Sequence, residues 1–303
     1  MHHFMWALDM ARRNYMKNVK LNNGVEMPIL GFGVFQVSDL KICEKAVADA
    51  IEVGYRLFDT ASVYENEEAV GNAIKKCGIK REEFFITSKV YMPEMGYENT
   101  KNAFENTLSK LKTDYLDLYL IHMPFGDYYG SWRAMEELYK EGKIKAIGVS
   151  NFTSDRIVDF CYNIKVIPAI NQIEIHPFYQ RDEEIKLLKE YKIQAQAWAP
   201  FAEGLNGMFT NPVLSKIAKS HGKSVAQVIL RFNIQRNIIV IPKSIHIERI
   251  EENFNVWDFE LNSEDIKAIA ELDLKRPQMV DTRSVSEVRR IYGFKDNSVI
   301  TSL

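Results

Sequence analysis

The sequence of 303 residues has little cysteine, and its cysteines form no recognisable ligand set. The three residues, Cys43, Cys77 and Cys161, make no CxxC pair and no Cys/His spacing of the kind found in zinc sites. Cys43 and Cys77 fall in helical patterns, so we expect free thiols that are buried or half-buried. An odd number of unpaired thiols is typical of a reducing compartment, and we predict a cytoplasmic protein.

An excess of charge and a long hydrophobic run are also missing. The formal net charge of −2 gives no electrostatic reason to expect a nucleic-acid or anionic-membrane partner. No run approaches the roughly 18 apolar residues of a membrane span. Residues 1–15 lack the apolar core and cleavage site of a secretion signal. We interpret 1–15 as a tag or disordered extension and 16–303 as a single domain.

From Pro28 onward the sequence alternates apolar runs with helical patterns. The apolar runs predict eight strands, at 29–33, 57–61, 84–90, 115–121, 144–149, 169–175, 193–199 and 238–241. Helical patterns follow them at 40–53, 67–77, 99–111, 132–139, 155–162, 183–191, 213–220, 225–235 and 247–254. Continuous apolar runs indicate strands that are covered on both faces. The series therefore predicts an α/β protein with a closed (β/α)8 TIM barrel.

Two local patterns refine this prediction. An open, doubly wound sheet would carry the turn G-x-G-x-x-G after its first strand, but residues 31–36 read GFGVFQ and lack the third glycine. Residues 19–27 contain Asn-Gly between two short alternating stretches, which is a strong hairpin signal. Because this segment precedes the first strand, we expect an N-terminal hairpin that closes the bottom of the barrel.

Four polar residues lie at the ends of the predicted strands. Asp59 belongs to the end of the second strand, Lys89 closes the third, His122 closes the fourth, and Tyr64 follows the second. The carboxyl ends of barrel strands meet at one mouth, so these side chains should lie close together. A single buried Asp–Lys pair or core histidine is often structural. The combination of all four indicates a catalytic cluster.

The chemistry of such a cluster follows from its residue types. A free tyrosine has a pKa of about 10 and is a poor proton donor at pH 7. We expect the Lys89 ammonium to stabilise the phenolate and so to lower the pKa of Tyr64. Asp59 would keep Lys89 charged, and neutral His122 would orient the same substrate oxygen. The set suits a reaction in which a carbonyl oxygen gains a proton.

Further segments extend this pattern along the chain: DTASVYENE at 59–67, SK at 88–89, LIHMP at 120–124, IGVSNF at 147–152, NQIE at 171–174 and IPKS at 241–244. In order and spacing they closely resemble the aldo-keto reductase superfamily, in its bacterial or protist NADPH-dependent form, over about residues 18–275. The resemblance implies a monomeric or weakly associated enzyme that reduces aldehydes or ketones with NADPH. Tyr64 would be the proton donor, with Asp59, Lys89 and His122 as the rest of the catalytic tetrad.

The same resemblance implies a set of cofactor-binding residues. The nicotinamide would be held by Ser150, Asn151, Gln172 and Trp198, with Trp198 stacked on its ring. The 2′-phosphate and adenine would be held by Lys243, Ser244, Arg249 and Asn253. Two cations and a hydroxyl at the start of a helix also suit an anion on physical grounds. We therefore predict that NADPH is preferred over NADH.

Departures from the family fall in the predicted substrate pocket, which consists of Phe35, Tyr91, His122 and Met123. Many relatives have tryptophan at positions 35 and 123. The connection 124–130 is short, which suggests an open pocket for small aldehydes, dicarbonyls or sugar-like substrates. The tail from 277 to 303 should lie near the mouth of the barrel. Its arginines, Arg283, Arg289 and Arg290, are better explained by a solvated helix face than by an anionic ligand.

Two other classes of function remain as alternatives. The first is an NADPH-binding regulatory subunit with little turnover, which the intact set of four polar residues argues against. The second is a metal-dependent barrel hydrolase, which needs clustered histidine and carboxylate ligands at strand ends. Only His122 and His176 are near such positions and no His-x-His motif is present. We therefore expect a small-molecule carbonyl substrate and no metal.

Overall fold

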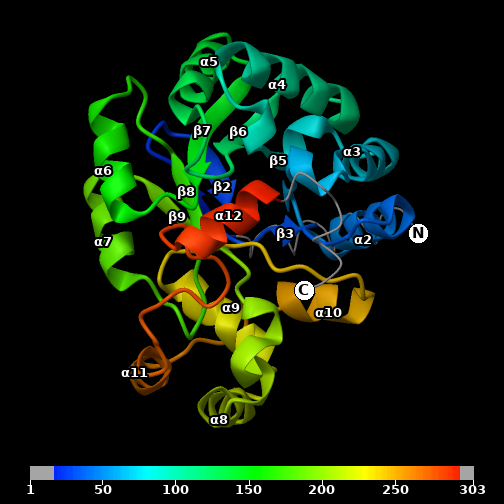
Figure 1. Cartoon of the computed structure of the whole chain (residues 1–303). Helices are drawn as coiled ribbons and strands as arrows, with labels where there is room; N and C mark the ends of the chain where they lie inside the picture. Colours follow the sequence, from blue (N-terminus) through cyan, green and yellow to red (C-terminus); the bar gives the residue numbers. More distant parts are fainter. Residues whose placement is uncertain (1–16, 294–303) are drawn as a thin grey trace.

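Eight parallel strands form the barrel in the computed structural model, which describes residues 17–293 (Figure 1). They are β3 (Phe32–Gly33), β4 (Leu57–Asp59), β5 (Phe85–Val90), β6 (Leu116–Ile121), β7 (Ile144–Ser150), β8 (Ile170–Glu174), β9 (Gln194–Trp198) and β10 (Ile239–Val240). Each strand pairs with the next along the chain. A parallel bridge between Leu30 and Val240 joins the first strand to the last and closes the ring. The predicted barrel is confirmed.

The predicted N-terminal hairpin covers the amino-terminal end of the barrel. Its strands β1 (Asn18–Lys20) and β2 (Glu26–Pro28) pair antiparallel. In the turn, the Asn22 amide donates to the Pro168 carbonyl at 3.0 Å and the Asn23 amide to the Lys145 carbonyl at 2.9 Å. Both acceptors lie where β8 and β7 begin, so the hairpin blocks that end and leaves the other end open for chemistry.

Helices surround the barrel in the predicted order (Figure 1). They are α2 (Leu40–Val53), α3 (Glu67–Lys76), α4 (Tyr97–Leu111), α5 (Tyr128–Lys140), α6 (Ser154–Tyr162), α7 (Asp182–Glu190), α8 (Pro212–His221), α9 (Val225–Gln235) and α10 (Ile247–Phe254). Short 3₁₀ helices lie at η1 (Ser62–Tyr64), η2 (Arg81–Glu83), η3 (Met92–Glu94) and η4 (Ala202–Thr210). No helix within residues 17–293 is long and apolar enough to cross a bilayer.

Capping residues explain where individual helices begin. The Asp39 carboxylate accepts hydrogen bonds from the Lys41 and Ile42 N–H groups, and α2 begins at the predicted residue. The Asp127 carboxylate accepts from the Gly130 N–H, so α5 begins four residues before the predicted start at 132. The apolar pattern missed this first turn, in which Tyr128 and Tyr129 pack against Phe160 of α6.

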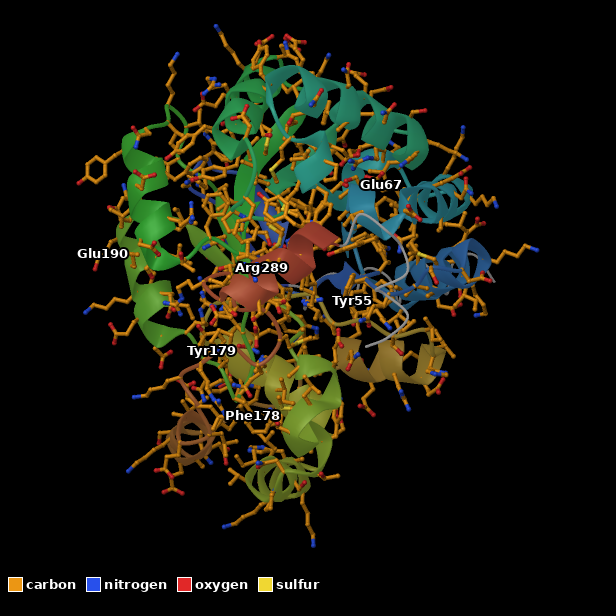
Figure 2. All side chains as sticks on the ribbon, viewed as in Figure 1. Tyr55, Glu67, Phe178, Tyr179, Glu190 and Arg289 are labelled. Atoms are coloured by element: carbon orange, nitrogen blue, oxygen red, sulfur yellow. The ribbon has the colours of Figure 1, made fainter. Side chains whose placement is uncertain are left out.

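Two C-terminal helices have no counterpart in the predicted series. They are α11 (Ser263–Ala270) and α12 (Val285–Gly293). Figure 1 shows α12, in red, lying across the end of the barrel, and Figure 2 labels Arg289 on its exposed side. The prediction that the tail lies near the mouth is confirmed as far as residue 293. The predicted extension 1–15 falls outside the described residues.

Side chains fill the barrel interior and the layer between the barrel and its helices (Figure 2). Trp132, Tyr55 and Tyr119 are among the largest fully buried side chains. A second cluster packs α8, α9 and α11 against one another below the loop that follows β9. The three cysteines are free, with Cys43 buried and the other two half-buried, as predicted.

Candidate active site

The four predicted catalytic residues come together at the carboxyl end of the barrel. Lys89 is 0% exposed, and its ammonium forms a short ion pair with the Asp59 carboxylate. The same ammonium donates to the Thr60 carbonyl at 2.9 Å and to the Tyr64 hydroxyl at 3.4 Å. The Tyr64 hydroxyl lies 3.5 Å from His122 Nε2. One oxygen, that of Tyr64, is therefore shared between a cation and an imidazole.

The pKa of Tyr64 is raised, contrary to the effect expected from Lys89 alone. Burial of the phenol is the largest cause, since it disfavours the charged phenolate. The Lys89 ammonium lowers the pKa of Tyr64, but it does not overcome burial, and the Asp59 carboxylate adds to the rise. Sequence reasoning considered the neighbouring charge and not the desolvation. At neutral pH the hydroxyl therefore keeps its proton.

The charge states of Lys89 and His122 agree with the expectation from sequence. Burial by itself would lower the pKa of Lys89, but Asp59 and Tyr64 outweigh it, so the pKa is raised and the ammonium stays charged. Burial, and then the Lys89 charge, hold the pKa of His122 well below its usual range. Neutral His122 faces Tyr64 through Nε2, while its Nδ1 is buried without a hydrogen-bond partner among residues 17–293.

The predicted nicotinamide residues form one hydrogen-bonded group beside the tetrad. Gln172, on β8, donates to the second Asp59 oxygen at 2.7 Å. The Ser150 hydroxyl, at the end of β7, donates to the Gln172 carbonyl at 2.8 Å. The Trp198 indole N–H, at the end of β9, donates to the Asn151 side-chain oxygen at 2.9 Å. Gln172 thus supports a carboxylate of the predicted tetrad, a role that sequence reasoning did not assign to it.

The predicted phosphate residues lie where β10 leads into α10. Lys243 and Arg249 are exposed, and neither side chain has a hydrogen bond or ion pair among the described residues. Ser244 is buried, and its hydroxyl accepts from the His246 N–H at 3.1 Å. Asn253 is buried on α10. The first turn of α10 has no side-chain cap, so its backbone N–H groups add to a site suited to an anion.

Aromatic side chains line the predicted substrate pocket around Tyr64 and His122. The ring of Phe35 is 42% exposed and lies 4.9 Å from the ring of Tyr64. The ring of Tyr91 lies 5.4 Å from the His122 ring, and burial raises its pKa to about 12. Met123 is buried, and its sulfur is 3.3 Å from the Asn151 amide nitrogen.

The C-terminal helix α12 packs against two of the predicted pocket residues, Tyr91 and Met123. Ile291 packs with Met123 and Phe125, and the Tyr91 hydroxyl donates to the Ile291 carbonyl at 3.3 Å. The ring of Tyr292 lies 5.9 Å from that of Phe125. Sequence reasoning placed the tail near the mouth but named neither Ile291 nor Tyr292, because no motif marks them.

Asn66 is another residue near the site that the sequence prediction did not include. It is fully buried, and its amide donates to the Val34 carbonyl at 2.8 Å and the Val37 carbonyl at 3.1 Å. Its side-chain oxygen accepts from the Thr60 hydroxyl at 2.8 Å. Asn66 therefore joins the loop that carries Phe35 to the loop that carries Tyr64. Its place in the segment 59–67 was a signal that could have been used.

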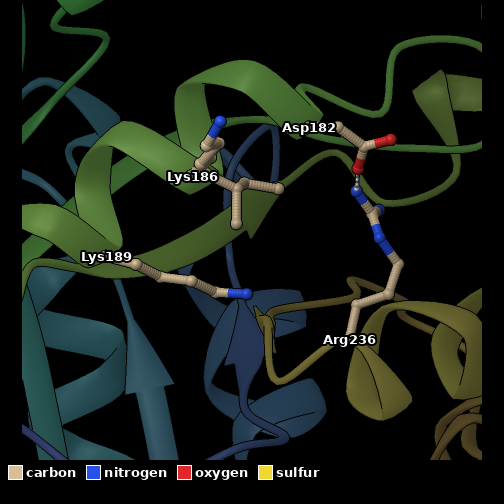
Figure 3. A pocket seen from close by; sticks show the side chains of 5 residues that line it. Asp182, Lys186, Lys189 and Arg236 are labelled. Atoms are coloured by element: carbon tan, nitrogen blue, oxygen red, sulfur yellow. Dashed lines mark hydrogen bonds and ion pairs between the residues drawn. The ribbon is translucent and has the colours of Figure 1, made fainter.

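A second place on the protein, away from the tetrad, is a surface cavity. This cavity of about 240 Å³ lies between α7 and the end of α9, lined by Asp182, Ile185, Lys186, Lys189 and Arg236 (Figure 3). Arg236 is paired there with Asp182 at 2.5 Å, as the dashed line in Figure 3 shows. Within residues 17–293, histidine, cysteine and acidic side chains form no group of three that could hold a metal ion.

Known proteins are similar to this chain in sequence and in structure. Glyoxal reductase of Bacillus subtilis is 49% identical to this chain, over 84% of the chain and 92% of that protein. Methylglyoxal reductase DkgA of Escherichia coli K12 is 42% identical, over 84% and 93%. A Bombyx mori aldo-keto reductase solved in complex with NADP superimposes with a TM-score of 0.84 at 32% identity, covering 90% of this chain and 97% of that one.

These relatives are named as reductases, which supports an oxidoreductase and does not support the regulatory-subunit alternative. The family model described as "Aldo/keto reductase family" matches residues 30–274, which contain the whole predicted tetrad and all the predicted cofactor residues. The chain belongs to the aldo/keto reductase family.

Proposed function

We propose that this protein reduces small aldehydes and dicarbonyls to alcohols with NADPH. The observation that carries the proposal is the Tyr64 hydroxyl, which lies between the Lys89 ammonium at 3.4 Å and His122 Nε2 at 3.5 Å at the open end of the barrel. A substrate carbonyl oxygen placed at that hydroxyl would meet a proton donor and a neutral imidazole. The names of the glyoxal and methylglyoxal reductases support the substrate class.

The residues present fit an NADPH cofactor. The unpaired cations Lys243 and Arg249 beside the uncapped start of α10 suit its phosphate. The half-buried Trp198 ring, fixed by its bond to Asn151, suits a flat ring against it. NADPH supplies a hydride from C4 of its nicotinamide to the carbonyl carbon.

The tetrad completes the reaction by moving one proton. Tyr64 holds its proton at neutral pH and gives it to the carbonyl oxygen as negative charge develops there. Lys89 then stabilises the phenolate that remains, from a position fixed by Asp59 and the Thr60 carbonyl. His122 is neutral and would donate from Nε2 to the substrate carbonyl oxygen, which orients the substrate.

The walls of the pocket favour compact substrates. Phe35 lies against the Tyr64 ring and Tyr91 against the His122 ring, and Ile291 of α12 packs with Met123 beside Tyr91. We expect a small dicarbonyl to bind between such walls without displacing α12. We further propose a cytoplasmic protein, as its free thiols suggest, and a monomer or weak dimer, as the resemblance to the aldo-keto reductases implies.

The test is loss of NADPH absorbance on mixing the purified protein with methylglyoxal or a nitrobenzaldehyde. We expect aldehyde-dependent loss in the wild type. In Tyr64→Phe we expect kcat to fall by about 10²- to 10⁴-fold, the usual contribution of a positioned acid, with NADPH affinity unchanged. Activity that survives in Tyr64→Phe would move the proton donor elsewhere. A wild type that binds NADPH but oxidises none of it with any aldehyde would contradict the proposal.

A further inference from the structure

Glu174 is a buried carboxylate at the end of β8 that the tetrad does not use. It is 1% exposed, and one of its oxygens accepts the Gln278 N–H at 2.8 Å while the other accepts the Val280 N–H at 3.3 Å. His176 Nε2 lies 3.0 Å from the first of these oxygens. A buried carboxylate is costly unless it is well paired. Two of its three partners belong to the C-terminal segment and not to the barrel.

The segment that Glu174 holds leads directly into α12. Residues 277–280 precede α12 by a short turn, and α12 ends against the substrate pocket. There the Ile291 carbonyl accepts from the Tyr91 hydroxyl, and the Ile291 side chain packs on Met123. Glu174 therefore fixes one end of a segment whose other end forms a wall of the pocket.

Gln278, which Glu174 binds, also contacts the loop after β9. The Gln278 side-chain oxygen accepts from the Asn206 amide of η4 at 2.9 Å. Glu174 and Val280 lie along one depression with Asn151 and Trp198, which places the anchor next to the predicted nicotinamide residues. Gln172 and Glu174 are two residues apart on β8, so their side chains share one face of the strand. One strand thus supports Asp59 and anchors the C-terminal segment.

We propose that Glu174 is a positioning residue for substrate selection: it holds residues 277–280 through two backbone N–H groups and thereby keeps α12 closed on the pocket. Its hydrogen bonds go to His176 and to the C-terminal segment, so it acts on the pocket through α12. Loss of the anchor lets Ile291 move away from Met123 and Tyr91. Substrates large enough to contact Ile291 then bind more weakly, whereas small dicarbonyls bind as before.

Two variants test this proposal from both sides of the contact. Glu174→Gln replaces one accepting oxygen by a donor, which opposes the N–H groups of the C-terminal segment. Gln278→Pro removes the 2.8 Å donor and leaves β8 unchanged. The matched control is Glu136→Gln. Glu136 also accepts two backbone N–H groups, from Lys165 and Val166 at 2.8 Å each, but it lies on α5 away from α12.

The first measurement is independent of activity. Arg283 is exposed between residues 277–280 and α12, so trypsin cleavage after Arg283 reports release of the segment. We expect cleavage to become about tenfold faster in Glu174→Gln and Gln278→Pro and to stay unchanged in Glu136→Gln, because cleavage of a native protein tracks local opening. Equal cleavage rates in all four proteins would overturn the anchoring role.

The second measurement rests on the proposed carbonyl reduction. We expect KM for a nitrobenzaldehyde to rise about tenfold, the loss of one apolar wall contact, while KM for methylglyoxal and both kcat values change by less than about twofold. A uniform loss of kcat for both aldehydes would mark Glu174 as a structural residue only and overturn the selection role. Absence of any wild-type turnover would instead contradict the proposed function and leave the trypsin result standing.

If Glu174→Gln does not fold, Gln278→Pro carries the test alone. A folded Gln278→Pro variant with wild-type cleavage and wild-type KM values would overturn the proposal.

Discussion

Replacement of Arg249 by alanine should separate NADPH binding from NADH binding. The two cofactors differ by the 2′-phosphate, and Arg249 is one of two exposed cations that we assign to it. Arg249 has no partner to be released from among residues 17–293, so its charge is available. Truncation therefore removes an interaction with NADPH and removes nothing from NADH.

The size of the effect follows from the exposure of the site. A hydrogen bond to a charged group contributes about 1.5–3 kcal/mol, which corresponds to roughly 10- to 100-fold in Kd. Exposure and salt reduce this value. The acidic residues Glu248 and Glu251 on the same helix, both exposed, reduce it further. We therefore expect about tenfold weaker NADPH binding in Arg249→Ala, near the low end of that range.

Calorimetric titration of both cofactors checks this prediction. Kd for NADPH should rise about tenfold in Arg249→Ala, and Kd for NADH should change by less than about twofold. Lys243→Ala should behave in the same way, whereas Lys20→Ala, an exposed lysine on the hairpin at the opposite end of the barrel, should change neither value. Equal losses for NADPH and NADH would refute the assignment of the phosphate site, and so would a loss that persists at high salt.

Three further predictions concern protons and packing. The raised pKa of Tyr64 means that the proposed donor stays protonated through neutral pH, so kcat for aldehyde reduction should be flat from about pH 6 to 9. The rate of alcohol oxidation, which needs the phenolate, should rise over the same range. A rate of reduction that falls between these pH values would contradict this prediction. The lowered pKa of His122 means that below about pH 6.5 the imidazole binds a proton in the unfolded chain but not in the folded protein. The free energy of unfolding should therefore drop on acidification, by up to about 1.4 kcal/mol per pH unit from this group, and urea titrations of His122→Gln should show a shallower drop than wild type. Gly71→Ala should lower the free energy of unfolding by about 1–3 kcal/mol, because the added Cβ would lie 2.6 Å from the Leu111 carbonyl oxygen. A Cβ added at Gly293 meets no atom within 4 Å, so Gly293→Ala should leave urea unfolding unchanged.

The sequence predicted the barrel and the positions of its tetrad because both depend on short-range pattern. Buried parallel strands read as apolar runs, and the first polar residue at the end of a run is already at the mouth of the barrel. Asp59, Lys89 and His122 could be placed this way without knowledge of their neighbours. Helix α2 was predicted to the residue from its apolar pattern, and in the structure Asp39 and Gly54 cap its two ends.

What the sequence did not predict depends on contacts between distant segments. Helix α12 is amphipathic over a single short stretch, and nothing in residues 285–293 indicates that it covers Met123 and Tyr91. The raised pKa of Tyr64 depends on how completely the phenol is buried, which a neighbouring lysine in the sequence does not reveal. The second role of Gln172, as a donor to Asp59, likewise appears only when β8 and β4 face each other across the barrel.

In the mechanism that we propose, the raised pKa of Tyr64 also determines how the tetrad works in the direction of reduction. A tyrosine with a pKa near neutrality would be partly ionised before substrate arrives and would have no proton to give. Burial keeps Tyr64 protonated, and the charged, fully buried Lys89 stabilises the phenolate only as it forms. Lys89 is therefore more important after the proton has left than before. Its partners Asp59 and the Thr60 carbonyl hold it in place for that moment, which explains why a lysine can lie fully buried at the end of β5.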